Sequence, residues 1–365
     1  MPSTLTRRPP VPPGLACRSH LPGLPTLQYL VRVPEPTPSS KRRGRLFRFG
    51  AACAVLSAVA GYVVVQYVSG GAGDPGCKVV AASGRSAGAG TTYEFTPEQA
   101  VNAATIAVVG TNRGMPERAV TIALATALQE SALRNLDHGD RDSLGLFQQR
   151  PSQGWGTPQE VTDPAYAANV FYEHLAKVPG YTDLPLTVAA QRVQRSGYPD
   201  AYAKHEPDAT LLAAALTGSS AATLTCEGRP GTTTTRGPDA VRAALVRDFG
   251  RETLQQAGAE VGAEDARPAA GVPAAETSGR TVTLPVSDDA AAGRSVSERG
   301  WQLAHWAVAN ASALHIERVQ YAGREWVAGN TDSRWRATAG GTEAAGAAGT
   351  GVGSGANAVR IVTAQ

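Results

Sequence analysis

Cysteine, methionine and aromatic residues are scarce in this sequence, whose 365 residues include four Cys, two Met and only 6% aromatic residues. The cysteines form no Cys-x-x-Cys pair, and the six His form no His-Glu-x-x-His motif. A zinc knuckle, a dithiol redox centre and a zinc-protease site are therefore not expected, and we predict neither a metal nor another cofactor.

Net positive charge is confined to the N-terminal part of the chain. Residues 1–48 contain nine Lys/Arg and one acidic residue, whereas the whole chain has a net charge of +3. The remaining residues are therefore net negative, which does not suit a surface that binds a nucleic-acid backbone. We expect no nucleic-acid partner.

A long apolar run follows this basic N-terminal segment. Residues 1–48 are Pro-rich and lack hydrophobic periodicity, which predicts a disordered basic tail. Residues 49–68 are almost wholly apolar and long enough to cross a hydrocarbon core of about 30 Å, which predicts a single transmembrane helix. The preceding positive charges place the N-terminus in the cytoplasm and the later domains outside the cell. A cleaved signal peptide is the alternative, but the run is longer than a usual signal and far from Met1.

The rest of the chain divides by composition and by helix signals. Residues 69–92 form a Gly/Ser/Ala-rich flexible spacer, 93–226 a helical domain with no obvious strand, 227–236 a linker, and 237–365 a small α+β domain with low-complexity loops. The Thr96-Pro97-Glu98-Gln99 and Ser295-x-x-Glu298 sequences predict capping boxes that open helices. Trp301, Trp306, Trp326 and Trp335 fit either core packing, which we favour, or a glycan-binding face.

The stretch from Leu124 to Trp155 contains the candidate chemistry. An apolar helix ends in Glu130-Ser131, an Asp-rich loop follows, and the segment Gly145-Leu146-Phe147-Gln148 comes next. These motifs resemble those of the lysozyme-like superfamily, in particular the Slt-type lytic transglycosylases and goose-type lysozymes, although Phe147 stands where Met is usual. The resemblance implies a mainly α lysozyme-like domain over 93–226. The later domain resembles C-terminal modules of actinobacterial cell-surface proteins.

Glu130 is the predicted catalytic acid. At 3.6 residues per turn it falls at the edge of the apolar helix face, where partial desolvation raises the pKa of a carboxyl group. A glycosidase general acid needs a raised pKa, because it must still hold its proton near neutral pH. The alternative is an ordinary surface Glu near a helix end.

The roles of the other candidate site residues depend on the mechanism. A hydrolase needs a second carboxylate, for which Asp140 and Asp142 are candidates, whereas a lytic transglycosylase needs none; both Asp residues could equally be solvated loop acids or caps. The resemblance also implies substrate-binding roles. Hydrogen-bonding or turn positions are Ser131, Gly145 and Gln148, and possible sugar-stacking walls are Phe147, Trp155 and Tyr202. An Asn that lines the cleft in Slt-type enzymes is missing here, with Gln191 nearest.

Together these features predict a membrane-anchored muramidase that cleaves peptidoglycan glycan strands outside the cell. A non-catalytic cell-wall-binding protein of the same fold is the alternative. A protein associated with heavy-metal transport is a third reading, disfavoured by the single apolar span and the lack of a Cys/His cluster. Cys77 and Cys226 bracket the helical domain on the external side, so we predict that they form a disulfide.

Overall fold

The computed structural model describes part of the chain, and all of this part belongs to one compact unit, Tyr67–Gln365. The described residues are 76–82, 92–234, 236–251, 277–288, 293–330, 334–338 and 357–364. The predicted tail at 1–48, the predicted span at 49–68 and most of the spacer lie outside them. None of the helices described is both long and apolar enough to cross a bilayer.

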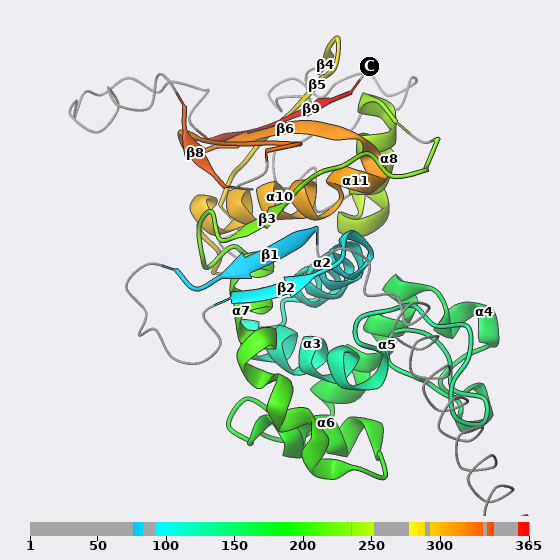
Figure 1. The fold of residues 1–365 in the computed structure, drawn as a ribbon. Helices are drawn as coiled ribbons and strands as arrows, with labels where there is room; N and C mark the ends of the chain where they lie inside the picture. The colour runs from blue at the N-terminus through cyan, green and yellow to red at the C-terminus, as the bar shows by residue number, and fades with distance from the viewer. Residues whose placement is uncertain are drawn as a thin grey trace, which may run out of the picture. The chain divides into compact units, whose positions relative to one another are not determined.

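The predicted fold class, a mainly α domain after one transmembrane helix, is wrong. The described residues form a mixed structure of helices and two antiparallel sheets, shown in Figure 1. The smaller sheet has the order β2-β1-β3, with β1 at Cys77–Val80, β2 at Thr92–Phe95 and β3 at Leu224–Cys226. Strand β1 lies inside the predicted spacer, and β2 and β3 fall in the region where no strand was expected. Strands of three or four residues are too short to show a clear alternation in sequence.

The disulfide between Cys77 and Cys226 is confirmed. The two residues face each other in the antiparallel pairing of β1 and β3, with their Cα atoms 3.9 Å apart. The bond joins residues separated by 149 positions in sequence. It therefore ties the two ends of the first helical region to each other.

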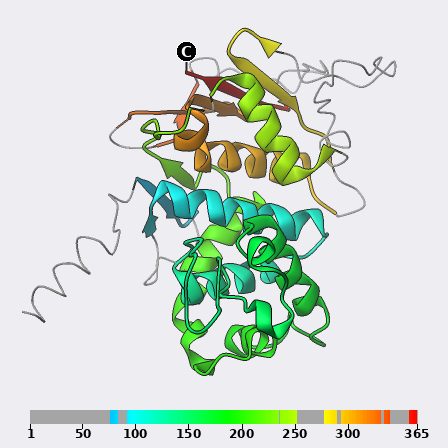
Figure 2. The same cartoon turned by 90° about the vertical axis from the view of Figure 1, so that its right-hand side faces the viewer.

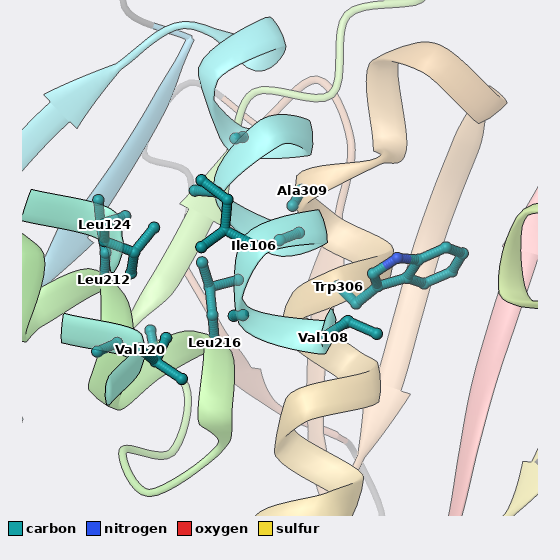
Figure 3. Close-up of a cluster of buried hydrophobic side chains, with 14 of the residues drawn as sticks. Ile106, Val108, Val120, Leu124, Leu212, Leu216, Trp306 and Ala309 are labelled. Atoms are coloured by element: carbon teal, nitrogen blue, oxygen red, sulfur yellow. The ribbon is translucent and has the colours of Figure 1, made fainter. Parts of the chain in front are cut away.

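Helix α2 (Pro97–Asn112) is the central helix of the described part. Thr96 and Gln99 form the predicted capping box, and the helix is buried on most sides. Figure 3 shows the apolar side chains of two other helices on one side of α2 and those of α10 (Val296–Ala309) on the other. The labelled residues are Ile106 and Val108 of α2, Val120, Leu124, Leu212 and Leu216 on one side, and Trp306 and Ala309 on the other.

The remaining helices of the first region surround α2. Asp163 caps α5, whose face containing Phe171 and Tyr172 is buried. The elements are α3 (Glu117–Ser131), α4 (Pro158–Val161), α5 (Pro164–Ala176), α6 (Leu186–Gln194) and α7 (Glu206–Thr217), with 3-10 turns at Pro151–Gln153 and Pro199–His205.

The second region is a six-stranded antiparallel sheet with helices α8 (Pro238–Phe249), α10 (Val296–Ala309) and α11 (Ala311–Leu314). The strand order is β4-β5-β9-β6-β7-β8, and β6 and β7 form a hairpin. The strands are β4 (Thr277–Ser278), β5 (Thr281–Pro285), β6 (Ile316–Tyr321), β7 (Arg324–Val327), β8 (Arg336–Ala337) and β9 (Ala358–Thr363).

Helix α10 joins the two regions, since it contacts β6 and β9 as well as α2 and α7. Figures 1 and 2 show it between the six-stranded sheet and α2. Gln302 donates a hydrogen bond to Thr111 Oγ1 (2.8 Å), and the Trp306 indole donates to Asp248 Oδ2 (2.8 Å). The four tryptophans of this region are buried, so the core-packing interpretation is confirmed. The two predicted domains thus share a continuous interior.

Candidate active site

Glu130 lies in the last turn of α3, at the point where the chain turns away from the helix. Ala132 and Leu133 both have positive φ (52° and 59°), so the helix ends sharply after Ser131. The Ser131 hydroxyl donates a 2.7 Å hydrogen bond to the carbonyl oxygen of Leu146 and lies 3.1 Å from that of Ala127. The two sequence motifs are therefore held against each other by a buried side chain.

The segment Gly145–Gln148 is a tight turn closed on both sides. Leu144 and Gln149 exchange backbone hydrogen bonds of 3.0 Å across it. Gly145 has φ +76°, and a Cβ at this position would lie 2.1 Å from the carbonyl oxygen of Val161. Any larger residue at 145 would displace backbone, which explains the glycine in the motif.

The Glu130 carboxyl is partly buried and accepts hydrogen bonds. The Tyr202 hydroxyl donates to Glu130 Oε1 at 2.6 Å, and the side chain of Gln194 also bonds to the carboxyl group. Burial raises the pKa of Glu130, and the two hydrogen bonds lower it by a smaller amount, so the pKa is raised from its ordinary value. This agrees with the environment expected of a proton donor.

Tyr202 positions Glu130, and its ring is not an exposed surface on which a sugar could stack. Its side chain is buried, and burial together with the neighbouring Glu130 charge raises the pKa of its hydroxyl. The phenol therefore keeps its proton and remains a donor to the carboxyl group. The predicted sugar-stacking role does not suit a ring that is closed off from solvent.

Phe147 also lies in the core. Its ring stacks on that of Phe171, with 4.7 Å between centroids, and none of its surface is exposed. Its carbonyl oxygen accepts a 2.7 Å hydrogen bond from Gln194. The side chain predicted to contact sugar instead packs the turn onto α5, and its backbone fixes a residue that bonds to Glu130.

Glu130 contributes to a pocket of about 1010 Å³ formed entirely by the first region. Of the other predicted site residues, Asp140, Gln148 and Trp155 line this pocket. The pocket lining does not include the other four predicted residues, which lie behind the lining residues and support them: Ser131, Gly145, Phe147 and Tyr202. The pocket volume is at the upper end of the range for small-molecule sites, so it could hold more than one sugar ring.

The two candidate second carboxylates differ in their surroundings. Asp142 accepts a 2.8 Å hydrogen bond from the Ser152 backbone and pairs with Arg150 at 2.8 Å. These contacts hold the pKa of Asp142 well below its ordinary value, and the Ser152 backbone hydrogen bond has the largest effect. Asp142 is therefore ionised at neutral pH and stabilises its own loop. Asp140 is exposed and lines the pocket.

Several pocket residues were not recognised from the sequence. Gln149 and Gln194 line the pocket, and their side-chain oxygens are buried with no hydrogen-bond partner among the described residues. Cationic side chains also line it, and they are spread over three segments of sequence, so no local motif marks them. They are Arg141, Arg150, Lys177, Arg192 and Arg195.

A metal site is not formed by the residues that the structure describes, since no group of three or more His, Cys, Asp or Glu among them could hold an ion. The chemistry available in the pocket is that of a carboxyl proton donor, amide groups and a set of cations.

Comparison with known proteins bears on the second region. Residues 242–346 match the family described as VldE, C-terminal domain. No curated protein matches the chain. The matched stretch begins inside α8 and ends before β9, the strand between β5 and β6. It covers less than half of the chain and includes none of the residues that line the Glu130 pocket.

Proposed function

We propose that this protein cleaves the β-1,4 bond of peptidoglycan between N-acetylmuramic acid and N-acetylglucosamine, with Glu130 as the general acid. The observation that carries the proposal is the state of this carboxyl group. It opens onto a large pocket, burial raises its pKa, and a neutral Tyr202 holds it in place. A carboxyl group in these surroundings can offer a proton to the leaving oxygen near neutral pH.

The contacts between the two sequence motifs support the same proposal. The resemblance to Slt-type lytic transglycosylases and goose-type lysozymes rests on Glu130-Ser131 and on the turn at Gly145–Gln148. The Ser131 hydroxyl bonds to the carbonyl oxygen of Leu146, within this turn. In addition, Gln194 bonds to both the Phe147 carbonyl oxygen and the Glu130 carboxyl. The motifs thus cooperate in placing one acid.

The lytic transglycosylase outcome is the form of the reaction that we propose. Glu130 gives its proton to the departing N-acetylglucosamine oxygen as the bond to C1 of the muramic acid breaks. The 6-hydroxyl oxygen of the same muramic acid then bonds to C1 and returns its proton to Glu130, leaving a 1,6-anhydro end. No second carboxylate is needed, which fits a site where Asp142 is already engaged by Arg150 and Ser152.

Product analysis tests this proposal. The full-length protein is incubated with purified peptidoglycan, and the released fragments are analysed by mass spectrometry before and after borohydride reduction. Anhydro ends, which borohydride does not reduce, are expected. Reducing ends would show hydrolysis, and the absence of any released fragment, with binding retained, would favour a cell-wall-binding protein.

We also propose that the protein acts outside the cytoplasm. Disulfides persist in oxidising compartments and are rare in the cytosol. The bond between Cys77 and Cys226 joins the two outer elements of the first region, so this region is suited to an oxidising environment. Thiol labelling of the protein isolated from its own cells should find these two cysteines oxidised; labelling of both without prior reduction would contradict the proposal.

A further inference from the structure

The Glu130 pocket has a charge that its proposed neutral sugar ligands do not explain. Four cationic residues line it whose side chains have no ion-pair or hydrogen-bond partner among the residues described, namely Arg141, Lys177, Arg192 and Arg195. A fifth, Arg150, is paired with Asp142. The acidic lining residues are Glu130 and Asp140. The pocket is therefore positive, although the chain beyond its first 48 residues is net negative.

Two of these cations, Lys177 and Arg195, act on the same part of the pocket wall. Lys177 follows α5, and Arg195 follows α6 with a positive φ of 53°. His174, whose ring packs edge-on against Trp155 at 4.4 Å, lies near both of them. Burial lowers the pKa of His174, and the charges of Lys177 and Arg195 lower it further. Like charges thus converge on one concave surface, where they attract an anion more strongly than isolated surface charges do.

The four cations lie on other segments of the pocket lining than the proton donor. Glu130 is in the last turn of α3, whereas Arg141 lies in the following loop, Lys177 follows α5, and Arg192 and Arg195 lie at the end of α6. They therefore offer positive charge to parts of a bound strand beyond the bond that Glu130 would cleave.

We propose that Arg141, Lys177, Arg192 and Arg195 bind carboxylates of the peptides attached to the glycan strand, so that the site selects peptide-bearing, anionic strands over neutral ones. This inference rests on the proposed function, because the strand that Glu130 would cut carries a peptide on each N-acetylmuramic acid. Free carboxylates on these peptides lie beside the scissile bond. Guanidinium and ammonium groups form charge-assisted hydrogen bonds to carboxylates, whereas uncharged N-acetyl sugars offer them no opposite charge.

A binding experiment with matched strands tests the proposal. The full-length Glu130→Gln protein is used, so that no strand is cut during the measurement. One ligand is a soluble, peptide-bearing peptidoglycan strand, and the other is the same strand with its carboxylates converted to amides. We expect the carboxylate form to bind about tenfold more tightly at low salt, and the preference to shrink as salt screens the exposed charges.

Two pairs of substitutions locate the effect. Lys177→Gln/Arg195→Gln removes two pocket charges. Gln carries a Cβ as Arg does, so the substitution does not change the backbone strain at the positive φ of residue 195. This pair should lose most of the preference for the carboxylate form while binding the amidated strand as before. Arg324→Gln/Arg360→Gln removes two exposed charges from β7 and β9, outside the pocket, and should leave the preference unchanged. Equal thermal midpoints would show that all variants are folded.

The outcomes separate this inference from the proposed function. Equal affinity for the two strands would overturn the carboxylate proposal and leave glycan cleavage standing. An equal loss of preference in both pairs would also overturn it, because the effect would then follow total charge and not the pocket. Failure of the protein to bind either strand would count against the proposed function itself.

Discussion

The Glu130 carboxyl owes its properties to neighbours that the chain brings together from three segments. Burial raises its pKa, whereas Tyr202 and Gln194 lower it by hydrogen bonding to the group. Activity that depends on a protonated acid is lost as the pH rises through the pKa of that acid. In the proposed reaction, the alkaline limb of the pH profile should therefore report on these neighbours.

Replacing Tyr202 with Phe should move this limb to higher pH. The substitution removes a hydrogen bond that favours the carboxylate, so the pKa of Glu130 rises further. The kcat at the optimum should fall, because the carboxyl group is less firmly held. Tyr198→Phe is the matched control, since Tyr198 lines the same pocket with an exposed side chain. A limb that stays in place in Tyr202→Phe, measured as kcat/KM against pH, would refute the role given to this hydroxyl.

The two aspartates should respond differently to substitution by Asn. Asp140→Asn should slow peptidoglycan cleavage by less than about tenfold and leave anhydro products, because a lytic transglycosylase does not need a second carboxylate. Asp142→Asn should lower the thermal midpoint by weakening the contacts with Arg150 and Ser152, with the same products. Fragment analysis and thermal unfolding check both results. A rate loss in Asp140→Asn as severe as that of a Glu130 variant would indicate hydrolysis.

Among individual residues, the sequence singled out Glu130 as the candidate acid but did not predict its surroundings. Glu130 and the turn at Gly145–Gln148 were recognised because both are local motifs. Phe147 and Tyr202 were assigned to the cleft surface, yet both are buried. An aromatic residue beside a motif packs into the core as readily as it lines a pocket, and only the packing of α5 and α6 decides between them.

At the scale of elements, the strand pair β1–β3 fixes the two ends of the first region. The disulfide closes a sequence separation of 149 residues. The loop-entropy treatment gives at most about 5 kcal/mol for a loop of this length, and strain or residual structure in the unfolded chain reduces the figure.

The Cys77→Ser/Cys226→Ser protein should be less stable by about 2–5 kcal/mol in urea unfolding. The loss should be reproduced by reducing agent on the unaltered protein, because both treatments remove the same cross-link from the unfolded chain. Reducing agent should then have no further effect on the double variant. Unchanged urea midpoints in both experiments would contradict a stabilising role for this bond.

Local signals predicted helices better than strands. The capping boxes at Thr96 and Ser295 are confirmed because a cap is formed by residues only three apart. No such local signal marked the end of α10, which stops at Ala309 before a short helix that follows Asn310. Strands β1 and β3 were missed, since their pairing depends on partners far away in sequence and leaves little periodicity in three or four residues.

On the scale of the whole molecule, α10 makes the two regions interdependent. His305 is fully buried: its Nε2 accepts a hydrogen bond from the Thr223 backbone N–H, and its Nδ1 donates one to the Ala215 carbonyl oxygen. Burial lowers its pKa to about 4. It is therefore neutral at physiological pH and part of the packed interface. This arrangement could not be read from sequence, because the composition of 227–236 resembles a linker and the contacts across it are not local.

Trp306→Ala should destabilise both regions together. Trp306 is fully buried in α10 and packs opposite α2, so the truncation should cost about 3–5 kcal/mol in free energy of unfolding. Amide hydrogen exchange should speed up in α2 and α7 as well as in α10. Tyr198→Ala, at an exposed position, should change neither. Faster exchange confined to the second region would show that the two regions unfold independently.

Peptidoglycan cleavage by the Glu130→Gln protein tests most directly whether Glu130 is the general acid. The substitution keeps the size of the side chain and removes its transferable proton. General acid catalysis contributes about 100- to 10,000-fold, so the release of soluble fragments from peptidoglycan should fall by at least that order. Strand binding and the thermal midpoint should be retained, and Glu173→Gln, at an exposed position on α5, should cleave normally. Full cleavage by Glu130→Gln would contradict the assignment of Glu130 as the catalytic acid.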